Sequence, residues 1–172
     1  MKKIVLLLIN LLFLNCISQI KINKSEDVDI LINLPQKLDA NREVILRNNV
    51  KKTFIIDPLG FHGKSFILVN NEVIEPINYV RGHYERLDLE MCKTDFILLK
   101  PYETKKVFIN FVSNDKKIYD YSKYPQFIRV VKSHHSYDTA TSLGCRAYLD
   151  NLEKMGYKIL SDSISAKIPY IK

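Results

Sequence analysis

Apolar and polar residues alternate with a period of two along most of this chain, in short segments separated by turn-forming residues. Because successive side chains of a strand point to opposite faces of a sheet, the alternation predicts strands with one buried face. Many short strands joined by frequent turns are typical of an antiparallel β-sandwich. The expected strands are Val28–Ile32, Glu43–Arg47, Thr53–Ile56, Phe66–Val69, Val73–Ile74, Arg86–Met91, Phe96–Leu99, Lys106–Phe111, Phe127–Val131 and a last strand containing Leu160, Ile164, Ala166, Ile168 and Tyr170.

Two of these segments carry specific local predictions. Asn70-Asn71 separates two strands by two residues that tolerate left-handed backbone angles, which predicts a tight hairpin turn. In Arg86–Met91 the alternation places Leu87, Leu89 and Met91 on one face of a strand.

One segment departs from the period of two. Between Thr141 and Met155 the apolar residues recur at the spacing of one helix face, and Gly156 follows as a helix terminator. The sequence therefore predicts one short α-helix over about 142–155, before the last strand. Its apolar face would hold Cys145, Tyr148, Leu149, Leu152 and Met155.

The amino-terminal segment has the anatomy of an export signal. Lys2 and Lys3 precede an apolar run of about 11 residues, which is shorter than the roughly 20 residues needed to span a bilayer. We expect a signal peptide over residues 1–18, cleaved before Gln19, so that the protein is secreted or periplasmic without a transmembrane span. Two alternatives stay open, namely lipidation at Cys16, which would anchor a lipoprotein, and retention of the uncleaved segment.

The length and composition of the remaining chain suit one domain over residues 19–172. The whole chain has 172 residues, of which 47% are hydrophobic and 26% charged, so a single core can form without a stabilising cross-link. The basic residues are scattered as isolated pairs such as Lys51-Lys52 and Lys105-Lys106, rather than clustered. We therefore expect no nucleic-acid partner.

Two cysteines remain after the expected cleavage site. Cys92 and Cys145 are 53 positions apart, and in an oxidising compartment such a pair is a disulfide candidate. The alternative is that Cys145 is a small apolar side chain on the buried face of the predicted helix.

Several short motifs resemble those of secreted bacterial immunoglobulin-like β-sandwich proteins of the Bacteroidetes type. They are Val44–Asn49, Leu99–Thr104, Tyr119–Lys123 and Phe127–Val130, which look like a B strand, a D–E turn and an E–F corner. The resemblance implies an immunoglobulin-like fold, which hosts many unrelated functions. The chain departs from the pattern at Tyr102, where glycine is usual, at Phe127, where tyrosine is usual, and by its extra helix.

Catalytic signatures are weak in this sequence. His62, His83, His134 and His135 are its histidines, with no His-x-x-x-His or Cys-x-x-Cys spacing. His134 and His135 would point to opposite faces of a strand. No Gly-x-Ser-x-Gly motif accompanies the serines. A metal site built from His83, His134, His135 and Asp138 would require the loops to bring these residues together, and we expect no cofactor.

Tyrosines and basic residues gather in two segments expected to be loops. Tyr119, Tyr121 and Tyr124 form one group, and Arg81, His83 and Tyr84 form the other. Tyrosine beside arginine is enriched in recognition surfaces, although a purely structural corner is the alternative. We therefore expect a non-catalytic secreted binding or structural module of the periplasm or cell surface, with a protein or glycan partner. Two other hypotheses are a small metal-dependent hydrolase and a periplasmic inhibitor or immunity-type protein.

Overall fold

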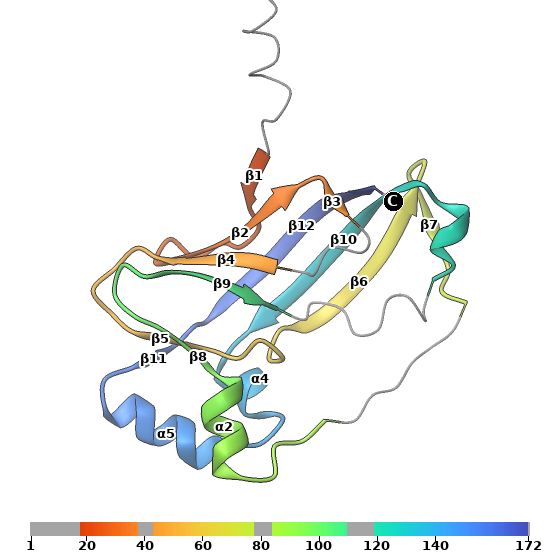
Figure 1. The fold of residues 1–172 in the computed structure, drawn as a ribbon. Coiled ribbons are helices and arrows are strands. Elements are labelled where there is room, and N and C mark those ends of the chain that lie inside the picture. The colour runs from red at the N-terminus through yellow and green to blue at the C-terminus, as the bar shows by residue number, and fades with distance from the viewer. Residues whose placement is uncertain (1–17, 38–42, 78–83, 110–118, 172) are drawn as a thin grey trace, which may run out of the picture.

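The computed structural model describes residues 18–37, 43–77, 84–109 and 119–171 (Figure 1). Within these ranges the fold is mainly β with several antiparallel sheets, as predicted, but it has a few short helices where the sequence predicted one. No helix among the described residues is long and apolar enough to cross a bilayer.

Two larger sheets form the body of the molecule. The first has four strands in the order β1 (Ser18–Lys21), β2 (Val28–Leu34), β4 (Glu43–Asn48) and β9 (Thr104–Phe108). The second has five strands in the order β3 (Gln36–Lys37), β12 (Asp162–Ile171), β10 (Gln126–His135), β6 (His62–Val69) and β7 (Glu72–Ile74). In Figure 1 the four-stranded sheet lies across the five-stranded one.

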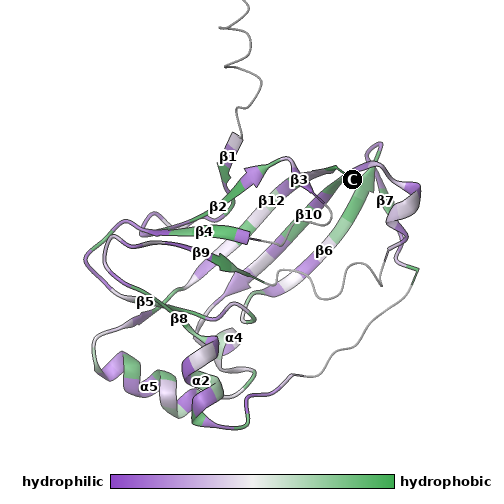
Figure 2. Cartoon of the chain, in the orientation of Figure 1, coloured by the Kyte–Doolittle hydropathy of each residue, from purple (hydrophilic) through white to green (hydrophobic). Residues whose placement is uncertain are grey.

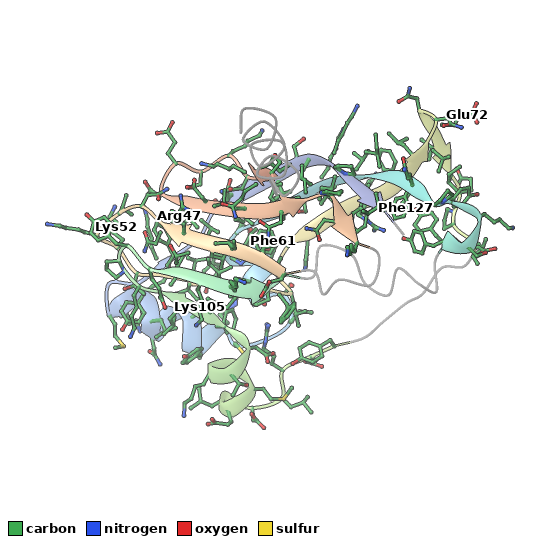
Figure 3. The ribbon with its side chains drawn as sticks, turned by 45° about the horizontal axis from the view of Figure 1, so that its top comes forward. Arg47, Lys52, Phe61, Glu72, Lys105 and Phe127 are labelled. Atoms are coloured by element: carbon green, nitrogen blue, oxygen red, sulfur yellow. A yellow bond between two sulfur atoms is a disulfide. The ribbon has the colours of Figure 1, made fainter. Side chains whose placement is uncertain are left out.

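The main core lies between these two sheets. Alternate residues of β2 and β4, such as Ile30 and Leu46, pack with Val131 of β10 and with Ile164 and Ile168 of β12. Burying each such side chain stabilises the fold by about 1.5–3 kcal/mol. Polar residues occupy the alternate outward positions, and Figure 2 shows the resulting purple and green segments along the strands. Lys52 and Glu72 extend from opposite ends of the molecule (Figure 3).

A smaller layer packs at one end of the sandwich. A three-stranded sheet in the order β11 (Lys158–Ile159), β5 (Phe54–Ile56) and β8 (Ile97–Leu99) packs with three short helices. These are α2 (Leu89–Asp95), α4 (Tyr137–Thr141) and α5 (Arg146–Lys154). A second core fills the space between them, formed by Ile55, Phe96, Ala140, Leu149, Leu152 and Ile159. A 3₁₀ helix, η1 (Tyr121–Lys123), precedes β10.

The predicted helix over about 142–155 is shorter than its pattern suggested. Helix α5 begins at Arg146, because Cys145 has a left-handed backbone with φ of 71° and serves as the N-cap. Met155 lies beyond the helix and is 67% exposed, whereas Leu149 and Leu152 are buried as expected. Residues 142–145 form the connection to a separate, earlier helix, α4, which Ser136 caps.

The predicted strand over Arg86–Met91 is wrong. The side chain of Asp88 accepts a hydrogen bond from the Met91 N–H and starts helix α2 at Leu89. Leu87 and Leu89, assigned to a buried strand face, are 81% and 55% exposed. The six alternating residues include Asp88, a residue type that favours the N-cap of a helix. This cap, rather than the alternation, determines the local structure.

Other local predictions are confirmed. Asn70 and Asn71 have φ values of 50° and 67° and form the turn between β6 and β7. Tyr102 has a φ of 58°, which explains why glycine suits that position in comparable turns. The strand expected over Lys106–Phe111 is β9, which ends at Phe108, and residues 110–111 lie outside the described ranges.

Candidate functional site

The outer face of the five-stranded sheet carries an unusual charge pattern. In the antiparallel register Lys64 of β6 lies opposite Lys132 of β10, and on the other side of Lys132 lies Ser165 of β12. Lys167 lies on the same face, two residues along β12, and Lys37 of β3 lies at the far end opposite Ile171. All four lysines are exposed. We call this surface the lysine face.

The lysine face has no compensating acid at the described outward positions of its strands. Within the described ranges, no carboxylate forms an ion pair with Lys37, Lys64, Lys132 or Lys167. Like charges directly opposite each other on neighbouring strands destabilise a sheet. The pair Lys64–Lys132 therefore carries a cost that no acidic side chain among the described residues of the face offsets.

The outer face of the four-stranded sheet is built differently. There Lys21 pairs with Asp29 at 2.7 Å, and Lys106 pairs with Glu43 at 3.6 Å. Partial burial alone would raise the pKa of Asp29, but the hydrogen bond from Lys21 and nearby positive charge lower it. Two outward lysines of this face, Lys21 and Lys106, are thus paired with carboxylates, whereas the lysines of the other face have no such pair among the described residues.

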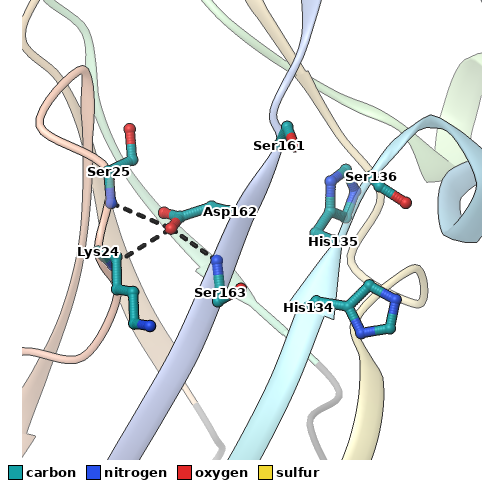
Figure 4. Close-up of a pocket in the computed structure, with 8 residues that line it drawn as sticks. All are labelled: Lys24, Ser25, His134, His135, Ser136, Ser161, Asp162 and Ser163. Atoms are coloured by element: carbon teal, nitrogen blue, oxygen red, sulfur yellow. Dashed lines mark hydrogen bonds between the residues drawn. The ribbon is translucent and has the colours of Figure 1, made fainter.

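A hollow of about 490 Å³ adjoins the lysine face where β10 ends and β12 begins. His134 and Ser163, which are register partners on these strands, connect the hollow to the face. Figure 4 shows the side chain of His134 turned away from Asp162. The lining residues are Lys24, Ser25, His134, His135, Ser136, Ser161, Asp162 and Ser163.

Asp162 serves the structure of the hollow. Its carboxylate accepts backbone N–H bonds from Lys24 at 3.2 Å, Ser25 at 3.0 Å and Ser163 at 2.7 Å, and also a bond from the Asn23 amide. These bonds attach the connection between β1 and β2 to the start of β12 (Figure 4). Four donors occupy most of the lone pairs of one carboxylate, which leaves little capacity for a ligand.

His135 is also committed to the structure. Its Nε2 accepts the backbone N–H of Asp57 at 2.9 Å, so its Nδ1–H donates to the Leu160 carbonyl at 2.5 Å. Burial lowers the pKa of His135, against a smaller upward effect of the Leu160 bond. The imidazole is therefore a neutral, buried connector between β10 and the smaller layer.

The metal site suggested by the sequence is not assembled by the described residues. His135 is buried and His134 is exposed, on opposite faces of β10 as their adjacency predicted. Asp138 is an exposed residue of α4, and His83 lies outside the described ranges. No group of three or more histidine, cysteine, aspartate or glutamate side chains among the described residues is arranged to hold a metal ion.

The expected tyrosine surface is largely internal. Tyr119 and Tyr121 are each 6% exposed and pack in an aromatic cluster with Phe127, while Tyr124 is half-buried against it. The Tyr121 hydroxyl accepts a hydrogen bond from Arg129 at 2.6 Å. The structure thus gives these rings the role of a structural corner.

The second expected group falls partly outside the described ranges. Arg81 and His83 lie in residues 78–83, which the structure does not describe. Tyr84 is 41% exposed, and its hydroxyl donates to Asp95 at 2.6 Å beside helix α2.

A buried ion network beside Tyr84 was not predicted. Arg86 donates two hydrogen bonds to Asp57, at 2.7 and 3.0 Å, and a third to Asp95 at 2.8 Å. The guanidinium also stacks on Phe96, with its carbon 4.6 Å from the ring centre. Burial alone would lower the pKa of Arg86, but the two carboxylates raise it, so the charge is held in place. This network and the Cys92–Cys145 disulfide together fasten α2 to the rest of the molecule.

The side chains left available at the hollow are donors. The Lys24 ammonium, the His134 imidazole and the hydroxyls of Ser161 and Ser163 have no side-chain partner among the described residues. Together with the lysine face they form a positively charged, hydroxyl-rich surface that suits an anionic or hydroxylated ligand. The sequence did not reveal this surface, because the surface depends on the strand register. The register places Lys64 opposite Lys132, which is 68 positions away along the chain.

Comparison with known proteins gives no further assignment, because no family model, curated protein or solved structure matches this chain.

Proposed function

We propose that this protein is a secreted, non-catalytic binding module that holds an anionic ligand on its lysine face. The observation that carries the proposal is the contrast between the two outer faces. Ion pairs balance lysines on the four-stranded sheet, whereas Lys64 and Lys132 lie opposite each other without a carboxylate from the described residues. An anionic ligand would supply the missing negative charge.

Two further observations support the export and the scaffold. The amino-terminal segment has the pattern of a signal peptide, and the Cys92–Cys145 disulfide suits an oxidising compartment. A two-sheet sandwich is also a rigid support, and the motifs that resemble immunoglobulin-like proteins agree with such a role.

The chemistry of the hollow favours binding over catalysis. A hydrolytic site needs a free general base or a nucleophile activated by one. His135 and Asp162 are the titratable groups most enclosed at the hollow, and both are engaged in structural hydrogen bonds. The groups that remain are Lys24, His134, Ser161 and Ser163, and His134 and the serines lie on strand β10 and at the start of β12 without a described carboxylate to orient the imidazole.

Binding to a simple polyanion tests this proposal. Dextran sulfate would be immobilised, and the protein beginning at Gln19 would be applied at low and at physiological salt. We expect binding that weakens with salt, because screening reduces attraction between exposed charges. The variant K64Q/K132Q/K167Q should bind at least about tenfold more weakly, since each ammonium that no longer bonds the polyanion weakens binding by about 1 kcal/mol or more.

A matched variant separates the lysine face from net charge. K51Q/K52Q/K106Q removes the same number of charges from a loop and from the other sheet, and should bind within about twofold of the wild type. Equal losses in the two variants would refute a specific face, as would a lack of binding at low salt.

A further inference from the structure

We infer that the ligand is a linear acidic polysaccharide that lies along β10, with one acidic sugar in the hollow formed by Lys24, His134, Ser161 and Ser163. This inference rests on the proposed function and adds the class of the ligand and its orientation. Four features of the surface support it, namely its length, its mixed chemistry, its hollow and its shortage of exposed rings.

The lysine face is a strip rather than a spot. Along β10 the outward positions run from Gln126 to His134, and the step between neighbours is two residues, or about 6.8 Å. The whole strip is therefore about 27 Å long. Lysines recur along it, with Lys37 at one end and Lys167 and the Lys64–Lys132 row further along, and His134 lies at the other end. An extended chain with repeated negative groups fits this distribution better than a compact anion.

The chemistry of the strip matches a sugar as well as an acid. Ser163 and Ser165 of β12 provide hydroxyls beside the charged rows, and both can donate to or accept from sugar hydroxyls. Leu68 lies opposite Ile128, and Phe66 lies opposite Val130 in the row that also holds Lys167. Val130 is buried, whereas Phe66, Leu68 and Ile128 are half-buried and give a small apolar stretch. A pyranose ring presents hydroxyl edges and an apolar C–H face, so both kinds of position have a partner on it.

The hollow has the size and the donors for one sugar unit. Its volume of about 490 Å³ lies within the usual range of small-ligand sites, about 300–1,000 Å³. Lys24 provides a charge for a carboxylate or sulfate, and Ser161, Ser163 and His134 provide hydrogen bonds from several sides. The N–H donors around the Asp162 carboxylate direct their positive ends at it, which offsets part of its repulsion of an acidic sugar.

Nucleic acid is less well suited to this surface. Single strands bind on series of exposed aromatic rings on which the bases stack. At the described outward positions of the three central strands Phe66 is the one aromatic residue, and it is half-buried. The serines and lysines therefore favour a sugar acid over a base-bearing polymer.

A comparison of polyanions by calorimetry tests the inference. The protein would be titrated with alginate oligosaccharides, neutral dextran, single-stranded oligothymidylate and phosphatidylglycerol vesicles, at equal ionic strength. We expect alginate to bind tightest and dextran not at all. The hollow variant K24Q/S163A should lose about fivefold or more of its alginate affinity, as expected when two hydrogen bonds to the ligand are removed. The control K51Q/S122A, changed at exposed sites elsewhere, should stay within about twofold.

The outcomes separate the ligand class from the proposed function. If K64Q/K132Q/K167Q weakens binding but oligothymidylate or vesicles bind as tightly as alginate, the polysaccharide is refuted and the anion-binding face stands. Unchanged alginate binding by K24Q/S163A would refute the sugar in the hollow in the same way. If the triple lysine variant binds every polyanion as the wild type does, both proposals fail.

Discussion

His135 connects three parts of the molecule through one neutral imidazole. It accepts from the Asp57 N–H, donates to the Leu160 carbonyl and lies against Phe61, with 4.8 Å between ring centres. A proton added to Nε2 would have to displace the Asp57 bond inside the core. His135 is 1% exposed, so the charged form would also lack hydration.

This arrangement predicts acid sensitivity. Burial places the pKa of His135 below 6.5 in the folded protein, so between that value and 6.5 the unfolded chain binds more protons. The free energy of unfolding should therefore fall as pH drops below about 6.5, with a slope of up to about 1.4 kcal/mol per pH unit. Urea unfolding at several pH values measures it. His134→Asn should keep the slope, and a slope that disappears in that variant would assign it to the wrong histidine.

Some features of single residues could be predicted from the sequence, and others could not. The opposite orientations of His134 and His135 followed from their adjacency in a strand. The pairing of Arg86 with Asp57 did not, because 29 positions separate them and their segments meet only in the smaller layer. The left-handed backbone of Cys145 was equally hidden, since the helical spacing of its neighbours includes it.

Strands β6 and β10 approach each other unusually closely at Gly63. A Cβ atom added there would lie 2.0 Å from the Lys132 carbonyl oxygen and 2.5 Å from the Ser133 Cα, both backbone atoms that cannot move independently of the strand. The close approach holds the segment between His62 and Lys64 against β10. Glycine at this position is therefore a requirement of the pairing that builds the lysine face.

Gly63→Ala should destabilise the protein strongly. The clash forces the two strands apart, and we expect a loss of about 3 kcal/mol or more in the free energy of unfolding. Gly156→Ala is the matched control: its φ is 90°, but nothing lies within 4 Å of the added atom, so about 1 kcal/mol should be lost. Chemical denaturation of both variants provides the comparison, and equal losses would contradict the steric argument.

The sequence predicted a strand or helix correctly where the burial of its side chains agrees with the hydrophobic pattern of the segment. Strands β2, β4, β10 and β12 follow the alternation because each has one face in the main core, and β6 buries Ile67 in the aromatic cluster of Tyr121 and Phe127. Helix α2 was missed because Leu89 at its start and Leu87 just before it are exposed, so their alternation does not report a buried face. The order of the strands could not be predicted from the alternation. The alternation shows which face of a strand is buried, but it does not show which strand is its neighbour.

The whole molecule consists of a sandwich and a smaller layer joined by a few strong connections. Besides the Arg86 network, the disulfide between Cys92 of α2 and Cys145 at the start of α5 crosses the helical layer. Of the two alternatives for Cys145, the structure shows the cross-link. Spacing alone did not decide between them, since a helix face and a disulfide both suit a cysteine near apolar neighbours.

Reduction should lower global stability. Closing a loop of 53 residues stabilises a folded chain by about 4 kcal/mol in the chain-entropy account. The midpoint of guanidinium unfolding should shift accordingly with reductant, and Cys92→Ala/Cys145→Ala should show the same shift without it. Two free thiols titrated in the folded, unreduced protein would contradict the cross-link.

Strand β12 sits inside the five-stranded sheet, although it follows all the other described strands along the chain. It pairs with β10 along ten residues and with β3 on its other side, and it contributes Ile164 and Ile168 to the main core. During synthesis, every other described strand emerges before the one that fills this place. The sandwich therefore closes only when β12 arrives, so the chain made before it stays open. Until β12 is made, the chain therefore lacks both a central strand of this sheet and two residues of the main core, and it should not fold stably.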